Sequence, residues 1–148
     1  EGEVFASDDD PDLVGDALPF SLKLIESLLA ESPRHRGLVL AAARGFTQYA
    51  FGWVEQPAKE IERENPVAAT NMRTRAARLY LRARDYGLRG FEIAHPGFAS
   101  TLRANASRAM RTVDARDVPL LYWTAASWGL AISASKDPIV DFFYPIKK

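Results

Sequence analysis

The sequence predicts an all-α protein made of antiparallel helix hairpins. Prolines follow capping residues at Asp10-Pro11 and Asn65-Pro66, which is the signature of a helix start. Between the prolines, apolar residues recur every three or four positions, and no convincing alternation of period two is present. Helix pairs separated by prolines indicate a repeat architecture, so we expect a degenerate tetratricopeptide-like array.

The first two long helices are expected over residues 10–32 and 36–55. Asp10 caps the first, and its apolar run ends before Pro33. Pro19 lies inside this helix and predicts a kink, because its ring removes one backbone donor. Pro57 is expected to bend or end the second helix, leaving Ala58–Glu64 as a short continuation or a linker.

Two further long helices are predicted in the second half of the chain. The first opens at Asn65-Pro66 and ends before Pro96, and Gly97–Thr112 forms short helical turns at most. Asp117 is expected to cap the last helix, which runs from Val118 to about Ser135. This helix carries no charged residue, so we expect other helices to enclose it. A membrane span is the weaker interpretation, since hydroxyl residues interrupt it and no basic cluster flanks it.

Small residues line one face of the third long helix. At about 100° per residue they share one stripe, which allows another backbone to approach closely. This approach offsets the cost of two helical glycines, about 1 kcal/mol each. The stripe consists of Ala76, Ala83, Gly87, Gly90 and Ala94. The spacing of Ser21, Ile25, Leu28 and Pro33 likewise resembles that of a tetratricopeptide unit.

Composition argues against several classes of function. The 148 residues carry 19 basic and 19 acidic side chains, so zero net charge gives no steering towards nucleic acid. The absence of cysteine excludes disulfides and thiolate ligands. No phosphate loop, HExxH or nucleophile-elbow motif is present, and His35 and His95 each adjoin a proline at a helix end. We therefore predict a protein that is not an enzyme and needs no metal or cofactor.

The acidic run near the N-terminus resembles a calcium site only in its charge. Asp8, Asp9, Asp10 and Asp12 lack the glycine turn and the terminal glutamate of an EF-hand loop. A helix N-terminus favoured by the macrodipole is the better interpretation.

Aromatic residues on the strongest helices are the leading functional candidates. Tyrosine and tryptophan are common where an apolar cavity meets water, although each ring could equally fill the core. We predict that seven aromatics line a cavity for a small hydrophobic ligand: Phe46, Tyr49, Trp53, Tyr80, Tyr122, Trp123 and Trp128. Arg75, Arg78 and Arg82 share another face and are predicted to meet a protein partner.

Three segments resemble proteins of the TatT family, the tetratricopeptide-like partners of tripartite ATP-independent periplasmic (TRAP) transporters. They begin at Val4, Arg75 and Asp117 and read VFASDDDPDLVGDALPFSLKLIESLLAESPRHRGLVLAAARGFTQYAFGWVEQPA, RAARLYLRARDYGLRGFE and DVPLLYWTAASWGLAIS. Together they cover most of residues 4–135 in the family's order, which matches the family's N-terminal half.

The resemblance implies a periplasmic, commonly lipid-anchored protein that binds the transporter's solute-binding protein. It also implies a homo-oligomer such as a trimer, with a passage for hydrophobic molecules through each protomer. The lipobox cysteine is not in this chain, and the ending KDPIVDFFYPIKK does not look like the family's usual continuation. We therefore expect an extension over residues 1–9, a helical TatT-like domain over 10–135, and an atypical or truncated segment over 136–148.

Two other hypotheses remain from the sequence. One is a generic helical-repeat scaffold that grips a peptide or protein in a groove without a small ligand. The other is an enzyme, which a buried carboxylate or histidine in a pocket would support. A continuous internal aromatic cavity would favour the transport hypothesis, and an exposed groove would favour the scaffold.

Overall fold

The computed structural model describes residues 2–135, and within that range it contains helices and no strand. The all-α class is therefore confirmed. The prediction of an atypical or truncated segment over residues 136–148 lies outside the described residues.

The helices of the described chain follow the order expected from the proline pattern. Their bounds are α1 (Gly2–Ala6), α2 (Pro11–Glu31), α3 (Arg36–Tyr49), the π-helical segment η1 (Ala50–Glu55), α4 (Gln56–Ile61), α5 (Pro66–Ala94), α6 (Phe98–Ala104), α7 (Ala106–Met110), the 3₁₀ turn η2 (Ala115–Asp117) and α8 (Val118–Ala134). The four long helices match their predicted ranges closely, and α1 adds a short helix within the expected N-terminal extension.

Side-chain caps fix where the long helices begin. The Asp10 carboxylate accepts a hydrogen bond from the Leu13 amide at 3.1 Å, and the Asn65 side chain accepts one from Ala68 at 3.0 Å. His35 plays the same part for α3, since its Nδ1 atom accepts from the Leu38 amide at 3.1 Å. Each cap satisfies an amide that the helix itself leaves without a partner.

The second predicted helix continues past Pro57. In α4 this proline occupies the first turn, and η1 lies directly before it. A π-helical turn has hydrogen bonds between residues five apart, which changes the backbone pattern just before the proline, so the helix can continue past its ring. Of the two alternatives for the segment after Pro57, the short helical continuation is correct.

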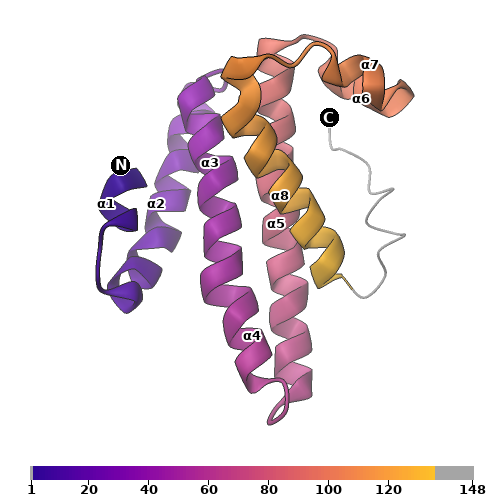
Figure 1. Ribbon diagram of the computed structural model, residues 1–148. Coiled ribbons are helices and arrows are strands. Elements are labelled where there is room, and N and C mark those ends of the chain that lie inside the picture. Colours follow the sequence, from indigo (N-terminus) through magenta and orange to yellow (C-terminus); the bar gives the residue numbers. More distant parts are fainter. Residues whose placement is uncertain (1, 136–148) are drawn as a thin grey trace.

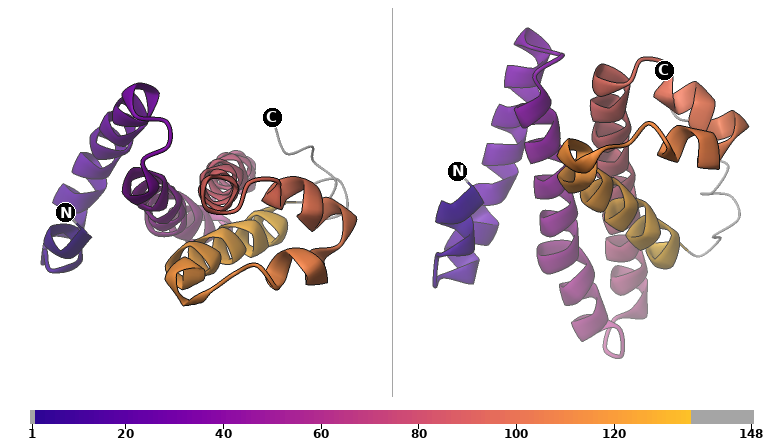
Figure 2. Two further views of the ribbon diagram at one scale, coloured as in Figure 1. Left: turned by 90° about the horizontal axis from the view of Figure 1, so that it is seen from above. Right: turned by 45° about the horizontal axis from the view of Figure 1, so that its top comes forward.

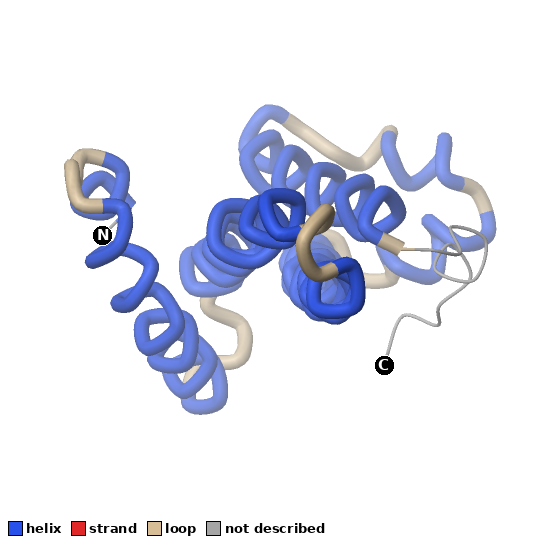
Figure 3. The backbone as a smooth tube through the Cα atoms, turned by 90° about the horizontal axis from the view of Figure 1, so that it is seen from below, coloured by secondary structure: helices blue, strands red, loops and turns tan. Residues whose placement is uncertain are grey.

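The long helices alternate in direction and form an array. In Figure 1, α2 rises, α3 and α4 descend, α5 rises and α8 descends. Contacts join α3, α5 and α8 to one another, whereas α2 packs mainly on α3. Seen from above, α6 and α7 lie beyond α5 and α8, on the side opposite α2 (Figure 2). Figure 3 shows the same arrangement from below, with short loops joining the helix ends.

The small-residue stripe of α5 lets another helix approach closely, as predicted, and at Gly87 and Gly90 this helix is α8. A Cβ atom on Gly87 would overlap the Thr124 hydroxyl, and one on Gly90 would lie 2.7 Å from the Leu120 Cδ2 atom. Ala76 and Ala83 are also fully buried, Ala76 in a cluster with Ala131 of α8 and Ala83 in a cluster with Phe46 of α3. Side chains larger than hydrogen at the two glycines would push α8 away from α5.

The prediction that other helices enclose α8 is wrong for one of its faces. Tyr122 is 63 % exposed and Val118 is 54 % exposed, and the exposed face continues along the helix through Ala125, Gly129 and Ser133. Three of these residues are small, so exposing them leaves little apolar surface in water. The absence of charged residues from α8 therefore does not require that every face of this helix be buried.

Candidate functional site

The seven aromatics predicted to line a cavity are distributed over different parts of the molecule. Tyr80 is fully buried in one apolar cluster, and Phe46 belongs to another. Trp128 packs against a third cluster, while Tyr122 projects into solvent. Tyr49, Trp53 and Trp123 are half-buried. The helices bring Phe46, Tyr49 and Trp53 together, but they place the three α8 aromatics elsewhere.

Phe46 and Tyr49 meet two of the predicted partner-binding arginines, and Trp53 stacks on Tyr49. The Arg82 guanidinium lies 5.3 Å from the centre of the Phe46 ring, and that of Arg75 lies 5.7 Å from the centre of Tyr49. The Tyr49 and Trp53 rings stack at 6.4 Å. We call this region the α2–α3–α5 surface and define it by Glu26, Phe46, Tyr49, Trp53, Arg75, Arg82 and Tyr86.

Arginine covers the aromatic rings because α3 and α5 lie side by side. A guanidinium over a ring face gains electrostatic attraction while its outer edge stays in water. Arg75, Arg78 and Arg82 are all exposed. This surface therefore presents cationic groups above an apolar floor, which suits contact with an acidic or amphipathic partner.

Glu26 links α2 to α5 at the centre of this surface. Its carboxylate accepts hydrogen bonds from Lys23 at 2.5 Å and from the Tyr86 hydroxyl at 2.9 Å, and it lies 3.6 Å from Arg82. Burial acts to raise the pKa of Glu26, but these hydrogen bonds and charges outweigh it and lower the pKa. Burial, followed by the Glu26 hydrogen bond, raises the pKa of Tyr86 to about 12.

The α2 helix is tied to the lower end of this surface as well. The indole Nε1 atom of Trp53 donates to the Pro11 carbonyl at 3.1 Å. Gly15 faces the Trp53 ring so closely that a Cβ atom there would overlap it. The start of α2 therefore depends on contact with η1, although the two segments are distant in sequence.

Tyr80 is buried inside the bundle, where its hydroxyl group has a carboxylate partner. Its hydroxyl donates to the Glu55 carboxylate, which also pairs with Lys59 at 3.1 Å. Burial, reinforced by that carboxylate, raises the pKa of the Tyr80 hydroxyl well above its ordinary value. This buried pair joins η1 to α5 and keeps the phenol protonated.

The α8 aromatics lie on the other side of α5. Tyr122 and Trp123 meet edge to face with ring centres 5.0 Å apart. The Trp128 ring lies under the guanidinium of Arg84, 5.1 Å from its centre. Arg84 is only 1 % exposed and is not among the site residues predicted from the sequence. The signal was available, because Arg84 lies four residues after Tyr80 and four before Leu88, on the buried face of α5.

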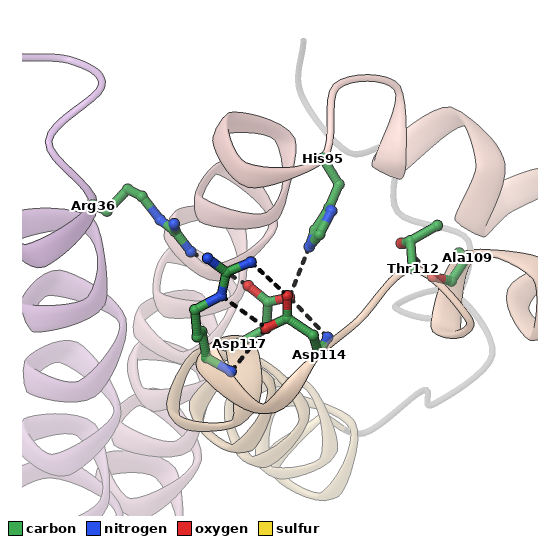
Figure 4. A network of polar contacts seen from close by, with 7 residues as sticks. Arg36, His95, Ala109, Thr112, Asp114 and Asp117 are labelled. Atoms are coloured by element: carbon green, nitrogen blue, oxygen red, sulfur yellow. Dashed lines mark hydrogen bonds and ion pairs between the residues drawn. The ribbon is translucent and has the colours of Figure 1, made fainter.

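A second polar cluster joins three helix ends at the top of the bundle (Figure 4). Asp117 is 2 % exposed, and its carboxylate contacts His95 Nε2 at 2.7 Å, Arg36 at 3.3 Å and the Asp114 amide at 3.1 Å. Burial acts to raise the pKa of Asp117, but the His95 hydrogen bond and the Asp114 amide lower it overall.

The prediction that Asp117 caps the last helix is wrong for its side chain. Asp117 occupies the N-cap position of α8, but its side chain makes no capping bond to that helix. The carboxylate instead turns towards Arg36 and His95, since these groups offer charge-assisted hydrogen bonds. Asp114 caps η2 by accepting from the Arg116 amide at 2.8 Å, and its Arg116 partner holds the pKa of Asp114 at about 2.

Over residues 2–135, no three His, Asp or Glu side chains gather in a way that could hold a metal ion. None of the helices that the structure describes is long and apolar enough to cross a membrane.

The fold and its surfaces define an all-helical protein whose exposed faces combine aromatic rings with arginines. The chain belongs to the family described as TRAP transporter T-component, whose model matches residues 7–140. It is also similar to an uncharacterized protein of Treponema pallidum (strain Nichols), with 36 % identity over 134 residues.

That alignment covers 88 % of this chain but 42 % of the relative, so the chain spans less than half of the relative's length. The family resemblance is confirmed. The description of this family associates its members with TRAP transporters.

Proposed function

We propose that this protein is a non-enzymatic, periplasmic accessory protein of a TRAP transporter. It binds the transporter's solute-binding protein and passes a small hydrophobic ligand. The observation that supports this proposal is the α2–α3–α5 surface, where Arg75 and Arg82 cover the rings of Tyr49 and Phe46. Family membership supports a transporter-related partner.

The partner contacts the arginines through acidic side chains. Charges at the edge of an interface steer encounter and suppress wrong partners. Arg78 is the most suitable of the three arginines for substitution, because it is exposed. Its replacement leaves Arg75 over the Tyr49 ring and Arg82 over the Phe46 ring.

The proposal is tested by capture of the solute-binding protein encoded with the transporter in the same genome. Arg78→Glu is expected to weaken capture about tenfold, because it places a carboxylate against an acidic partner. Arg103→Glu is the matched control, since Arg103 is exposed on α6, beyond α8 and away from α2. No complex with the unmodified protein at micromolar concentration would overturn the proposal, and equal loss in both variants would remove Arg78 from it.

The second candidate is a protein-binding scaffold without a small ligand. The distribution of the seven aromatics over separate clusters favours it, because no single cluster holds them all. Capture of the solute-binding protein without any binding of a hydrophobic probe would select this candidate.

We further propose a homo-oligomer such as a trimer, and a lipid anchor that holds the protein at a membrane. Four exposed apolar residues on α2 support self-association: Leu13, Phe20, Leu24 and Leu28. Their spacings of seven, four and four residues place them on one side of the helix.

A further inference from the structure

Two buried donors between α5 and α8 make no hydrogen bond. Within the described residues, Arg84 Nη1 and Trp128 Nε1 are buried side-chain atoms without an acceptor. Arg84 Nε and Nη2 are both occupied by one oxygen of Asp85, at 3.1 and 2.8 Å. The guanidinium therefore has one satisfied edge and one empty edge.

The two side chains that carry these donors without an acceptor are neighbours in the fold. The Arg84 guanidinium lies over the Trp128 ring, 5.1 Å from its centre. Native proteins pair nearly all buried polar groups, because leaving a donor without an acceptor costs stability. Arg84 and Trp128 are therefore unusual, because each of these two neighbouring side chains keeps one buried donor without an acceptor oxygen.

The surroundings of this donor pair are apolar. Leu81 and Leu88 lie three residues before and four after Arg84, on the same side of α5. Leu121 lies two turns before Trp128 on α8, and both pack against the cluster that contains Leu88. An occupant would place an oxygen on the donors and hydrocarbon against these leucines.

We propose that Arg84 and Trp128 form a head-group site for an aliphatic carboxylic acid. A carboxylate suits both donors, since indole and guanidinium N–H groups only donate and a charge-assisted bond to guanidinium is stronger than a neutral one. Asp85 balances part of the Arg84 charge from its exposed side, so the site holds one anionic group. This inference rests on the proposed function and names the chemical class of its ligand.

The site differs from the cavity expected from the sequence. Of the seven predicted lining residues it uses Trp128 alone, and it adds Arg84 from α5. It also lies apart from the α2–α3–α5 surface, because Arg84 faces α8 whereas Arg75 and Arg82 cover rings of α3. Ligand binding and partner binding can therefore be tested separately.

The first test compares three probes with one chain length by calorimetry: decanoate, decanol and decyltrimethylammonium. Decanoate should bind about tenfold more tightly than the cation, because the donors have no acceptor capacity. Trp128→Phe keeps the ring under Arg84 and removes the N–H group, while Arg84→Met keeps an apolar stem and removes the guanidinium. Both should erase the preference for decanoate, and the controls Trp53→Phe and Arg75→Met should retain it.

A second measurement stands even where Arg84→Met fails to fold. The chain has three tryptophans, so indole N–H resonances in a ¹⁵N spectrum are readily assigned by single substitution. Decanoate should shift the Trp128 signal and leave that of Trp53, which is bonded to the Pro11 carbonyl, in place. Equal affinity for all three probes, or an unmoved Trp128 signal, would overturn the inference and leave the donors to water.

Capture of the solute-binding protein by the same preparations separates the two proposals. Loss of the decanoate preference with capture intact would overturn this inference alone. Recognition of decanoate without capture would overturn the proposed partner and leave the site standing.

Discussion

The Nε2 atom of His95 lies 2.7 Å from the Oδ2 atom of Asp117, and this contact joins the end of α5 to the start of α8. Arg36 reaches the other oxygen of the same carboxylate from the first turn of α3. One buried side chain therefore ties together three helices that are separated along the chain. Its position at the top of the bundle sets how the helix ends meet (Figure 4).

We expect Asp117→Asn to destabilise the fold by about 2 kcal/mol, because it weakens two charge-assisted hydrogen bonds at a buried position. Chemical denaturation at neutral pH measures the change in the free energy of unfolding. Asp16→Asn, an exposed position on α2, should change it by less than about 0.5 kcal/mol. A loss no larger than that of the control would show that the cluster is not a stabilising contact.

The Asp117 carboxylate also makes the free energy of unfolding depend on pH in the acidic range. Its pKa is lowered in the folded protein, so its contribution is present above the unfolded value of about 3.9 and is lost as pH falls through the folded pKa. Asp117→Asn should therefore flatten the acid limb of the stability curve. Thermal unfolding between pH 6 and about pH 2 measures this effect, and parallel curves for variant and parent would contradict it.

Tyr86 gives a matching prediction at alkaline pH. Its pKa rises from 10.0 to about 12 in the fold, so its hydrogen bond to Glu26 contributes fully below pH 10 and is lost as pH rises towards 12. Tyr86→Phe should lower stability by about 1 kcal/mol at pH 8 and by less near pH 12. Denaturation curves at the two values measure the difference, and an equal loss at both would contradict the prediction.

Glycine substitutions test the close packing of α5 on α8. Gly87→Ala should destabilise by about 1–3 kcal/mol, because its Cβ atom would overlap Thr124. Gly129→Ala is the matched change on α8, where nothing lies within 4 Å, and it should stabilise by up to about 1 kcal/mol through helix propensity. Melting temperatures report both signs, and stabilisation by Gly87→Ala would contradict the packing.

The apolar side of α2 tests the proposed self-association. Replacing Phe20 and Leu24 with serine should lower the mass measured by light scattering from that of an oligomer to that of a monomer. Val67→Ser, at a position that is about as exposed as Phe20 but lies in the first turn of α5, should leave the mass unchanged. An oligomer that survives the α2 double substitution would place the interface elsewhere.

The family, the helical class and most helix ends could be predicted from the sequence. Helix ends are local features, because Asp10 and Asn65 satisfy amides only three residues away. The stripe of small residues on α5 is equally readable, since the helical period places its members on one face. Its contact with Thr124 and Leu120 follows that prediction.

The tertiary structure alone decided which side chains share a surface. Helical periodicity puts seven aromatics on strong helices, yet the packing of α3 and α8 on different parts of α5 separates Phe46 from Trp128. In the sequence Asp117 has the position of a helix cap, but in the fold its carboxylate contacts His95 and Arg36, which come from other helices. Arg84 and Arg82 are two positions apart, and only the neighbouring helices determine that one is buried against Trp128 while the other covers Phe46. A period fixes the face of one helix, but burial and charge pairing depend on what packs against that face.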